Sequence, residues 1–491
     1  MNGFNSSIAF FLPEIILTAG ILAIIVEQIF IKRNFTIYIA LLAMALAVIF
    51  TCAQTDILSQ KLFSNLLVID PFAVFFKILI LVSSLFIIYF SYVSNEITIH
   101  ADKSKEFLLF VLLTTLGGLL MVSSVNLLLI YISIEMVNIC LYFMTSATNS
   151  THASIKNITF GLISSGLMLF GISLLFGISG SLDLYRISTF LSVNTFNPDT
   201  LLIAVLLILT GLCYKIISIP SYFTLPGIYQ KSPIPVSAIL STTVFIAGFG
   251  LIIRFFLTVF HNPLSTVQNP DIFNLIPAIK WNLILAIIGL LTLILSNLTA
   301  IVQNNLKRLM AFISAAQGGY ILLGLSCANP KGLTSSIFYI LINLFNILGL
   351  FFCIILITNR NREENINSVK GLFSSSPYLA ISFIIFLLSS AGFPVTSGFT
   401  ARLFILSAML NNLPEWMIAL GGANILIGVY YVLKILKTIF SKSLTPVQII
   451  NLKPEEIFVM SVLLIPSIFG GIFFSPLIKV AELSSEIFGL K

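Results

Sequence analysis

Three charged residues lie deep inside apolar stretches of this sequence. Glu135 lies in LLLIYISIEMVNICLYF, Lys215 in LTGLCYKIISIP, and Arg402 follows SSAGFPVTSGFTA. A charge at the centre of a membrane helix costs about 2.5–3.5 kcal/mol on insertion scales, so such residues mark functional sites by default. A carboxylate and an amine can each bind and release a proton, and each alters the proton affinity of the other. Glu135 and Lys215 are therefore a candidate proton relay, with a static ion pair between helices as the alternative.

Other charges lie nearer the ends of apolar stretches. Lys77 follows Pro71 by six residues, and Glu14 and Glu27 lie near opposite ends of the first stretch. Long side chains near helix ends can reach the membrane interface while their stems stay in the apolar region. We therefore expect such snorkelling to account for these three charges.

Two proline-containing breaks lie beside the two buried cations. KIISIPSYFTLPGIYQKSPIPV carries Pro220 after Lys215, and SSAGFPVTSGFTARLFIL carries Pro394 before Arg402. Proline removes a helical hydrogen bond, and the freed carbonyls must be buried in protein or line a wet cavity. A pair of broken helices in two halves of a chain is typical of the internal repeats of transporters. Two incidental proline kinks are the alternative.

The elements that would hold these residues are membrane helices. The chain has 491 residues, 58% hydrophobic and 9% charged, whereas a soluble domain has about 45–50% apolar and about 25% charged residues. Fourteen apolar stretches have about the length that spans a bilayer. They lie near 8–30, 35–54, 71–93, 106–124, 126–147, 155–178, 200–219, 235–260, 281–302, 310–327, 334–358, 377–411, 415–440 and 456–477. We therefore predict an all-α polytopic membrane protein with fourteen helices, and exclude a soluble enzyme, a nucleic-acid-binding protein and a secreted disulfide scaffold.

The basic residues predict the orientation. If the helices alternate, fifteen Lys and Arg residues, Lys307 among them, lie on one side and seven, Arg254 among them, on the other. The positive-inside rule places the first side in the cytoplasm, matrix or stroma, and both termini opposite. The histidines, His100, His152 and His261, are scattered and no cysteine has metal-ligand spacing, so no metal site is expected.

On these residues the chain resembles the antiporter-like membrane subunits of NADH:quinone oxidoreductase (complex I), namely subunit N of bacteria, subunit 2 of mitochondria and their counterpart in the plastid dehydrogenase complex. The matching stretches, in family order across residues 106–405, are EFLLFVLLTTLGGLLM, YISIEMVNICLYFM, SSGLMLFGISLLFGISG, YKIISIPSYFTLPGIYQKSPIPVSA, LKRLMAFISAAQGGYILLG and SSAGFPVTSGFTARLFIL. The resemblance implies two inverted five-helix repeats, helices 4–8 and 9–13, in which helices 7 and 12 are broken. We expect one membrane domain over residues 1–491, divided into three N-terminal helices (1–105), a first repeat (106–260), a second repeat (281–440) and a C-terminal helix (456–491).

The resemblance also implies proton translocation along a hydrated polar axis at mid-membrane. Matched by position, Glu135 is the family's glutamate on helix five and Lys215 its lysine on helix seven. Arg402 stands where the family usually has a lysine on helix twelve. Because arginine stays protonated at any relevant pH, Arg402 can shape an electric field but is a poor proton relay.

Two further positions depart from the family pattern. Phe245 stands where the family commonly has a lysine on helix eight, and Gln317 where it usually has a histidine on helix ten. The nearest polar residues to Phe245 include Thr242 and Thr243. These threonines and Gln317 are the candidate residues of the polar axis at these positions. Because of the two departures, we expect proton movement through this subunit to be weak or to follow an altered path.

The resemblance implies an energy-converting subunit of NADH:ubiquinone reductase with no catalytic residue or redox site of its own. NAD, FMN, iron–sulfur clusters and quinone are expected in partner subunits, because the sequence has no strand–turn–helix GxGxxG and no cluster-ligand set. The expected partners are other membrane-arm subunits and lipids, with no nucleic acid. The alternatives are a subunit of a multi-subunit cation/proton antiporter, a stand-alone solute carrier, and a structural subunit that does not pump.

The richness in Ile, Phe and Asn resembles that of AT-rich organellar genomes. The mitochondrial inner membrane is therefore the expected location, with the thylakoid membrane and the bacterial plasma membrane as alternatives.

Overall fold

The structure is a computed structural model of the 491-residue chain. It describes residues 7–31, 35–55, 59–98, 101–146, 151–262, 276, 279–361, 363–410, 412–441 and 450–485. Helices dominate these residues, and the one sheet they contain is a two-stranded antiparallel hairpin.

The elements follow one another in this order. The N-terminal part and first half contain α2 (Leu12–Val26), η1 (Glu27–Ile31), α3 (Thr36–Cys52), β1 (Gln60–Leu62), β2 (Leu67–Ile69), α4 (Pro71–Val93), α5 (Asn95–Thr98), α6 (Ala101–Ser123), α7 (Leu127–Ser146), α8 (Thr151–Ser179), α9 (Leu184–Val193), α10 (Pro198–Lys215), η2 (Ser221–Phe223), α11 (Leu225–Lys231), α12 (Ile234–Ile239), η3 (Leu240–Val244) and α13 (Phe245–Val259). The second half contains α14 (Trp281–Ile301), α15 (Leu306–Ser326), α16 (Pro330–Asn361), η5 (Ile366–Val369), α17 (Leu372–Ser375), α18 (Pro377–Ala391), α19 (Ser397–Met409), α20 (Glu415–Phe440), α21 (Pro454–Ile472) and α22 (Ser475–Ser485).

The helices confirm an all-α polytopic membrane protein. Twelve helical spans of the described residues are long and apolar enough to cross a membrane, and α3, α18 and α19 are shorter apolar helices. Each of the fourteen predicted stretches contains at least one of these helices. The number that cross the membrane and the inverted repeats stay predictions.

Helix α4 shows how local sequence places an element. The Asp70 carboxylate accepts a hydrogen bond of 2.6 Å from the Ala73 N–H, and Pro71 occupies the first helical position. A carboxylate at the N-cap satisfies a free N–H group, and proline fits there because its missing N–H would have no helical partner. The helix then runs for 23 residues, about 34 Å, which is enough to cross the apolar core of a bilayer.

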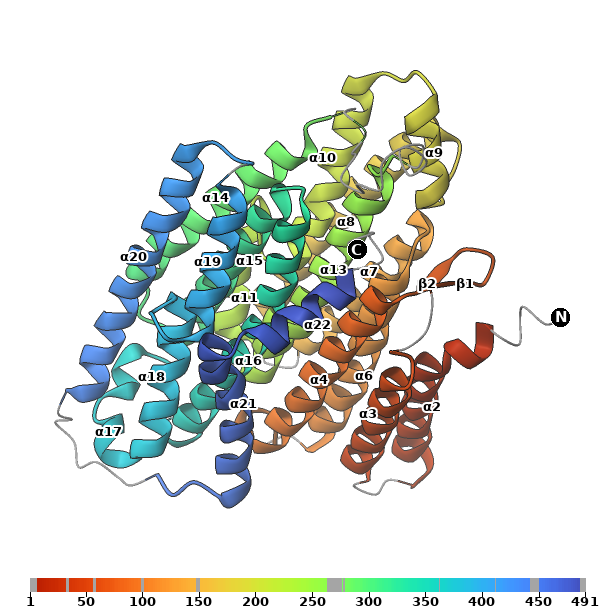
Figure 1. The fold of residues 1–491 in the computed structure, drawn as a ribbon. Helices are drawn as coiled ribbons and strands as arrows, with labels where there is room; N and C mark the ends of the chain where they lie inside the picture. Colours follow the sequence, from red (N-terminus) through yellow and green to blue (C-terminus); the bar gives the residue numbers. More distant parts are fainter. Residues whose placement is uncertain are drawn as a thin grey trace.

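The helices lie side by side, with α2 and α3 at one edge and α20 at the opposite edge (Figure 1). The short C-terminal helix α22 crosses them obliquely and contacts α16 and α4. Helices α12, η3 and α13 form one buried span at the centre, in which all residues of the most apolar window are inside the molecule. This span carries a π-helical turn, η3, directly before Phe245.

Three expectations for charged residues are wrong. Lys77 and Glu14 do not reach the interface: both are buried, and their Nζ and Oε1 atoms form an ion pair of 2.6 Å. Glu27 is also buried, and the Thr36 hydroxyl donates to its Oε2 at 2.7 Å. Snorkelling fails at all three positions because neighbouring protein, rather than lipid, surrounds the side chain.

Arg254 and Lys307 are not free loop cations. Arg254 lies inside α13, where its guanidinium contacts both carboxylate oxygens of Asp70 at 2.8 Å and its Nε donates to the Val122 carbonyl. Lys307 is 3% exposed and lies in the first turn of α15, which begins at Leu306, four residues before the predicted start of that helix. Arg254 is thus held in a buried ion pair, and Lys307 is a buried cation paired with the half-buried Glu96 and Glu364.

Candidate functional site

Lys215 is the last residue of α10, and the helix breaks directly after it. Ile217 has a left-handed backbone (φ 58°), and the peptide bond between Ile219 and Pro220 is cis. The apolar stretch predicted from the sequence continues to residue 219, four residues beyond Lys215. The break therefore begins earlier than predicted, and Pro220 lies within it rather than at its start.

Lys215 is 3% exposed and belongs to a three-residue polar cluster. Its Nζ donates to Asn138 Oδ1 at 2.5 Å, and Asn138 Nδ2 donates to Glu135 Oε1 at 3.2 Å. Glu135 and Asn138 are three residues apart on α7, so they lie on one helix face. Asn138 thus links the predicted acid and the predicted amine, which form no direct ion pair within the described part of the chain.

Asn138 was not among the predicted site residues. Its signal was present: an amide side chain in an apolar stretch, three residues after the acid Glu135. A buried amide must satisfy both its oxygen and its NH₂ group. Here the oxygen faces the ammonium and the NH₂ group faces the carboxylate, so the amide matches both charges.

Arg402 lies in α19, just after the second break. Its Nη1 donates to the Ala391 carbonyl and its Nη2 to the Ser390 carbonyl, both at the C-terminus of α18. Helix α18 ends at Gly392, and the chain passes Pro394 before α19 begins at Ser397. Pro394 therefore lies in the second break, as predicted, and Arg402 reaches back to cap the helix before it.

The rest of the Arg402 environment is aromatic and amide. Its Nε donates to the Tyr339 hydroxyl at 3.2 Å, and its guanidinium lies 4.6 Å from the centre of the Tyr320 ring. The Tyr339 hydroxyl donates to Gln317 Oε1, and Gln317 Nε2 donates to the Ser390 carbonyl at 2.9 Å. Gln317 thus lies in the Arg402 cluster, and both tyrosines were missed because nothing in the sequence places them near Arg402.

The two cations share one structural environment. Lys215 ends α10, and the guanidinium of Arg402 lies at the end of α18, so each positive charge is at the C-terminus of the first part of a broken helix. The free carbonyls there carry a partial negative charge that favours a cation. The breaks therefore create two cation-stabilising ends inside the apolar region.

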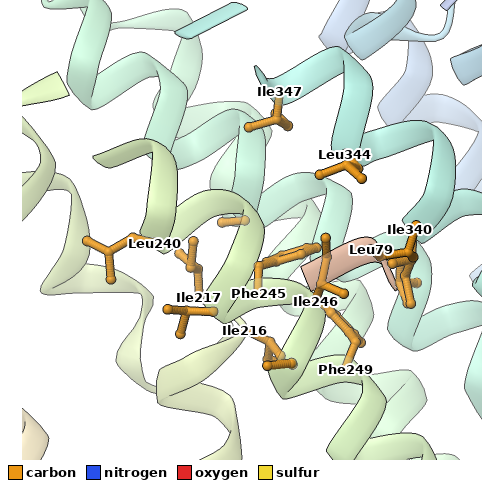
Figure 2. Close-up of a cluster of buried hydrophobic side chains, with 14 of the residues drawn as sticks. Leu79, Ile216, Ile217, Leu240, Phe245, Ile246, Phe249, Ile340, Leu344 and Ile347 are labelled. Carbon is orange, nitrogen blue, oxygen red and sulfur yellow. The ribbon is translucent and has the colours of Figure 1, made fainter. Parts of the chain in front are cut away.

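An apolar cluster lies between the Lys215 and Arg402 clusters. Ile216 and Gly318, the residues that directly follow Lys215 and Gln317, meet Phe245 here: a Cβ at Gly318 would lie 3.1 Å from the Ile216 carbonyl and 3.3 Å from the Phe245 ring. Figure 2 shows Phe245 among side chains from four parts of the chain. Those labelled are Leu79, Ile216, Ile217, Leu240, Ile246, Phe249, Ile340, Leu344 and Ile347. Phe245 is 1% exposed, so the centre of the expected axis is apolar at this point.

The hydroxyls before Phe245 form two separate hydrogen-bonded groups. Thr243 Oγ1 lies 2.8 Å from Ser83 Oγ and 3.2 Å from Ser84 Oγ on α4. Ser241 Oγ lies 2.7 Å from the Tyr229 hydroxyl and also accepts from Ser314. The Thr242 hydroxyl donates to the Ala238 carbonyl of its own helix. Of the two threonines expected in the axis, only Thr243 reaches other helices.

An ion cluster joins the two halves at the end where α5, α12 and α15 begin. Lys307 Nζ lies 2.9 Å from Glu96 Oε1 and 2.7 Å from Glu364 Oε1. Glu96 Oε2 accepts from the Ile234 N–H, the first residue of α12, at 2.7 Å. This cluster fixes the start of the central span against the second half.

No group of three or more His, Cys, Asp or Glu side chains that could hold a metal ion occurs within the described residues. Of the three histidines, His100 lies outside them.

Comparisons with known proteins agree with this geometry. Residues 124–428 match the model of a family described as NADH:quinone oxidoreductase/Mrp antiporter, transmembrane. The chain belongs to this family. It is 32% identical to NADH-quinone oxidoreductase subunit N 2 of Chloroherpeton thalassium, over 98% of this chain and 94% of that protein. It is 30% identical to the chloroplastic NAD(P)H-quinone oxidoreductase subunit 2 of Mesostigma viride, over 96% and 95% of the two chains.

Solved structures share the fold. A chain of respiratory complex I from Thermus thermophilus superposes with a TM-score of 0.78 at 21% identity, over 96% of this chain and 99% of that one. A chain of the archaeal membrane-bound sulfane sulfur reductase gives 0.85 at 21% identity, over 98% of both chains. A chain of the Mrp complex from Dietzia sp. gives 0.82 at 18% identity, over 98% of both. The antiporter-like fold therefore extends over nearly the whole chain.

Proposed function

We propose that this chain is a proton-translocating, antiporter-like membrane subunit of an NADH:quinone oxidoreductase. The observation that carries the proposal is the Lys215–Asn138–Glu135 cluster: a buried amine at the end of a broken helix, joined through one amide to a carboxylate. Relatives that match over nearly the full chain are named as subunits of that enzyme. The redox chemistry belongs to partner subunits in this proposal, and the contribution of this chain is to move protons.

The cluster has the properties that a proton-loading site needs. Burial disfavours a charged amine, whereas the carbonyls at the end of α10, the Asn138 oxygen and the nearby Glu135 favour it. These opposing effects depend on the separation of α7 and α10. A small shift of the broken helix would change which effect dominates, and so load or unload a proton at Lys215 Nζ.

The apolar cluster around Phe245 gives this subunit an altered or weakened path. Protons cannot pass along side chains that neither donate nor accept, and Phe245 replaces the central polar residue that the family commonly has. Arg402 keeps its proton and serves to hold the second break. Lys215 and Glu135 are thus the relay residues of this proposal, and Arg402 is a fixed charge.

The test is the number of protons moved per electron pair by the intact complex in proteoliposomes. With Lys215→Ala we expect this number to fall while NADH oxidation measured with uncoupler is largely kept, because the redox sites lie elsewhere. Lys370→Ala removes an exposed lysine and is the matched control. If Lys215→Ala pumped as many protons per electron pair as the control, Lys215 would have no part in proton movement.

Two other functions of the same fold predict different results. A cation/proton antiporter subunit would exchange sodium for protons without copurifying with an NADH-oxidising arm. A structural subunit, which the residues Phe245 and Arg402 favour, would leave proton stoichiometry unchanged in every variant of this chain.

The relatives support a membrane location but not the choice of membrane. The chain is a multi-pass membrane protein. The two relatives described above come from a bacterium and a chloroplast, so they fit the two alternative locations. We keep the mitochondrial inner membrane as a prediction, which a fractionation of the source cells would test.

A further inference from the structure

Helix α4 carries two buried ion pairs that differ in one respect. In the Asp70–Arg254 pair, both carboxylate oxygens accept from the guanidinium, Asp70 Oδ1 also accepts from Ala73 N–H, and the third guanidinium nitrogen donates to Val122. Every guanidinium nitrogen and both carboxylate oxygens of this pair form at least one hydrogen bond. Such a pair is a structural clamp.

The Glu14–Lys77 pair is different. Lys77 Nζ lies 2.6 Å from Glu14 Oε1, and the side chains are 1% and 0% exposed. Neither Glu14 oxygen accepts a hydrogen bond of normal geometry from any described residue. An ammonium has three donors and a carboxylate about four acceptor positions, so most of the capacity of this pair is unused. Buried polar groups are normally satisfied, and an exception calls for an explanation.

The pair has a defined place between the middle of α4 and its first turn. Lys77 lies six residues, about 9 Å, beyond Pro71, at the end that the positive-inside rule assigns to the outer side. Ser83 and Ser84 lie at the middle of the same helix, where their hydroxyls meet Thr243 beside Phe245. A proton that reaches these hydroxyls is therefore halfway along α4, with Lys77 between it and the outer surface.

The hydroxyl group also connects toward Lys215. Thr115 of α6 donates to Ser84 Oγ at 2.9 Å. The preceding residue, Thr114, hydrogen-bonds the thiol of Cys140, which follows Asn138 by two residues on α7. Two neighbouring threonines of α6 thus lie beside the Lys215 cluster and beside the middle of α4, respectively.

We propose that Glu14 and Lys77 form a second proton-binding site, through which protons from the Lys215 cluster leave toward the outer side. This inference rests on the proposed function. In the step we propose, Lys77 gives one proton to Glu14 Oε1, and the pair becomes a neutral amine and a neutral acid. Glu14 then releases that proton outward, Lys77 binds the proton that arrives along α4, and the ion pair is restored with no net change.

The charges around the pair leave it free for this role. The elements that pack against α4 and α2 carry few charges near it. Helix α3 has none, α13 has Arg254, which is bound to Asp70, and α5 has Glu96, which is paired with Lys307. The charges of α6 lie at the opposite end, and those of α16, Lys331 and Arg360, lie at the two ends of that helix. Lys479 and Glu482 of α22 are exposed. Glu27, at the far end of the N-terminal span, is hydrogen-bonded by Thr36. No described ion pair other than that with Glu14 involves Lys77.

The experiment measures protons moved per electron pair by the intact complex in proteoliposomes. We expect Glu14→Gln and the double variant Glu14→Leu/Lys77→Leu each to lower this number by the same share as Lys215→Ala. Replacing a buried ion pair with apolar residues of similar size is usually tolerated by the fold, so the double variant separates proton binding from packing. Glu27→Gln, a buried carboxylate at the other end of the same span, is the matched control and should pump at the wild-type level.

A second readout does not depend on pumping. Redox-induced infrared difference spectra of the complex should contain a protonated-carboxyl band that disappears with Glu14→Gln and persists with Glu27→Gln. The proposal is overturned if no such band depends on Glu14, or if the double variant pumps at the wild-type level while Lys215→Ala does not. If Lys215→Ala also pumps at the wild-type level, the proposed function itself fails.

Discussion

At the scale of single residues, Asn138 joins the two titratable groups of the Lys215 cluster. Its amide oxygen is the only hydrogen-bond acceptor that the described residues offer to the Lys215 ammonium. We expect Asn138→Leu to lower the protons moved per electron pair toward the value for Lys215→Ala, since a hydrogen bond to a charged group contributes about 1.5–3 kcal/mol. Proton stoichiometry in proteoliposomes checks this prediction.

The control for Asn138→Leu is Asn157→Leu. Asn157 is as buried as Asn138. The substitution removes the hydrogen bonds of Asn157 with Tyr214 and Thr145, neither of which involves Lys215. Equal stoichiometry in the two variants would show that Asn138 acts only through packing.

Glu135 and Lys215 could be predicted as site residues from the sequence, because a charge within an apolar stretch is visible without a structure. The pairing of Glu14 with Lys77 could not be predicted from the sequence, because these residues lie 63 positions apart and close to helix ends. Residues in such positions look like snorkelling side chains until the packing of α2 against α3 and α6 is known. Tertiary burial, rather than position along a helix, decides their role.

At the scale of elements, both broken helices were predicted from their prolines, but the residue where each helix ends was not. Helix α10 ends at Lys215, five residues before Pro220. Helix α18 ends at Gly392, where the backbone is left-handed (φ 78°). Glycine adopts this conformation without strain, so it ends helices readily. The end of a helix thus depends on capping contacts that the proline positions do not contain.

Gly392→Ala tests the second break. Other L-residues are strained in the left-handed region by about 1–2 kcal/mol, and a Cβ at Gly392 would lie 2.5 Å from Arg402 Nη1. We expect a destabilisation of about 2–5 kcal/mol, which combines the backbone strain with about 1–3 kcal/mol of overpacking. The unfolding midpoint of the purified chain in detergent measures the loss.

Gly180 offers a matched control for this substitution. It has a similar backbone (φ 67°) and no atom within 4 Å of the position a Cβ would occupy. Gly180→Ala should therefore show only the backbone strain. If the two variants were equally destabilised, the contact between Arg402 and the end of α18 would contribute nothing.

At the scale of the whole molecule, the distribution of basic residues predicts which side each loop faces. With both termini on the outer side, Lys331, at the start of α16, lies outside, and Lys453, before α21, lies inside. In a variant whose exposed Cys52 is replaced by Ala, we expect a membrane-impermeant maleimide to label Lys331→Cys only in right-side-out vesicles. Lys453→Cys should be labelled only in inverted vesicles.

Labelling of both positions from the same side would mean that the number of crossings between them is even, and would overturn the predicted orientation. The prediction does not depend on Arg254 and Lys307, because each is paired with carboxylates of this chain. Moving Arg254 from the outer loops to the interior makes the bias toward the inner side stronger.

The π-helical turn η3 makes the central span sensitive to its length. A π-turn holds one more residue than an α-helical turn, and each residue advances a helix by about 100°. Deleting one residue between Leu240 and Val244 would thus rotate either the start of the span away from the Ile234–Glu96 contact or α13 away from Asp70. Substitutions in this turn change single contacts, whereas a deletion changes the register of a whole helix. Natural variants of this segment should therefore differ in residue type but keep its length.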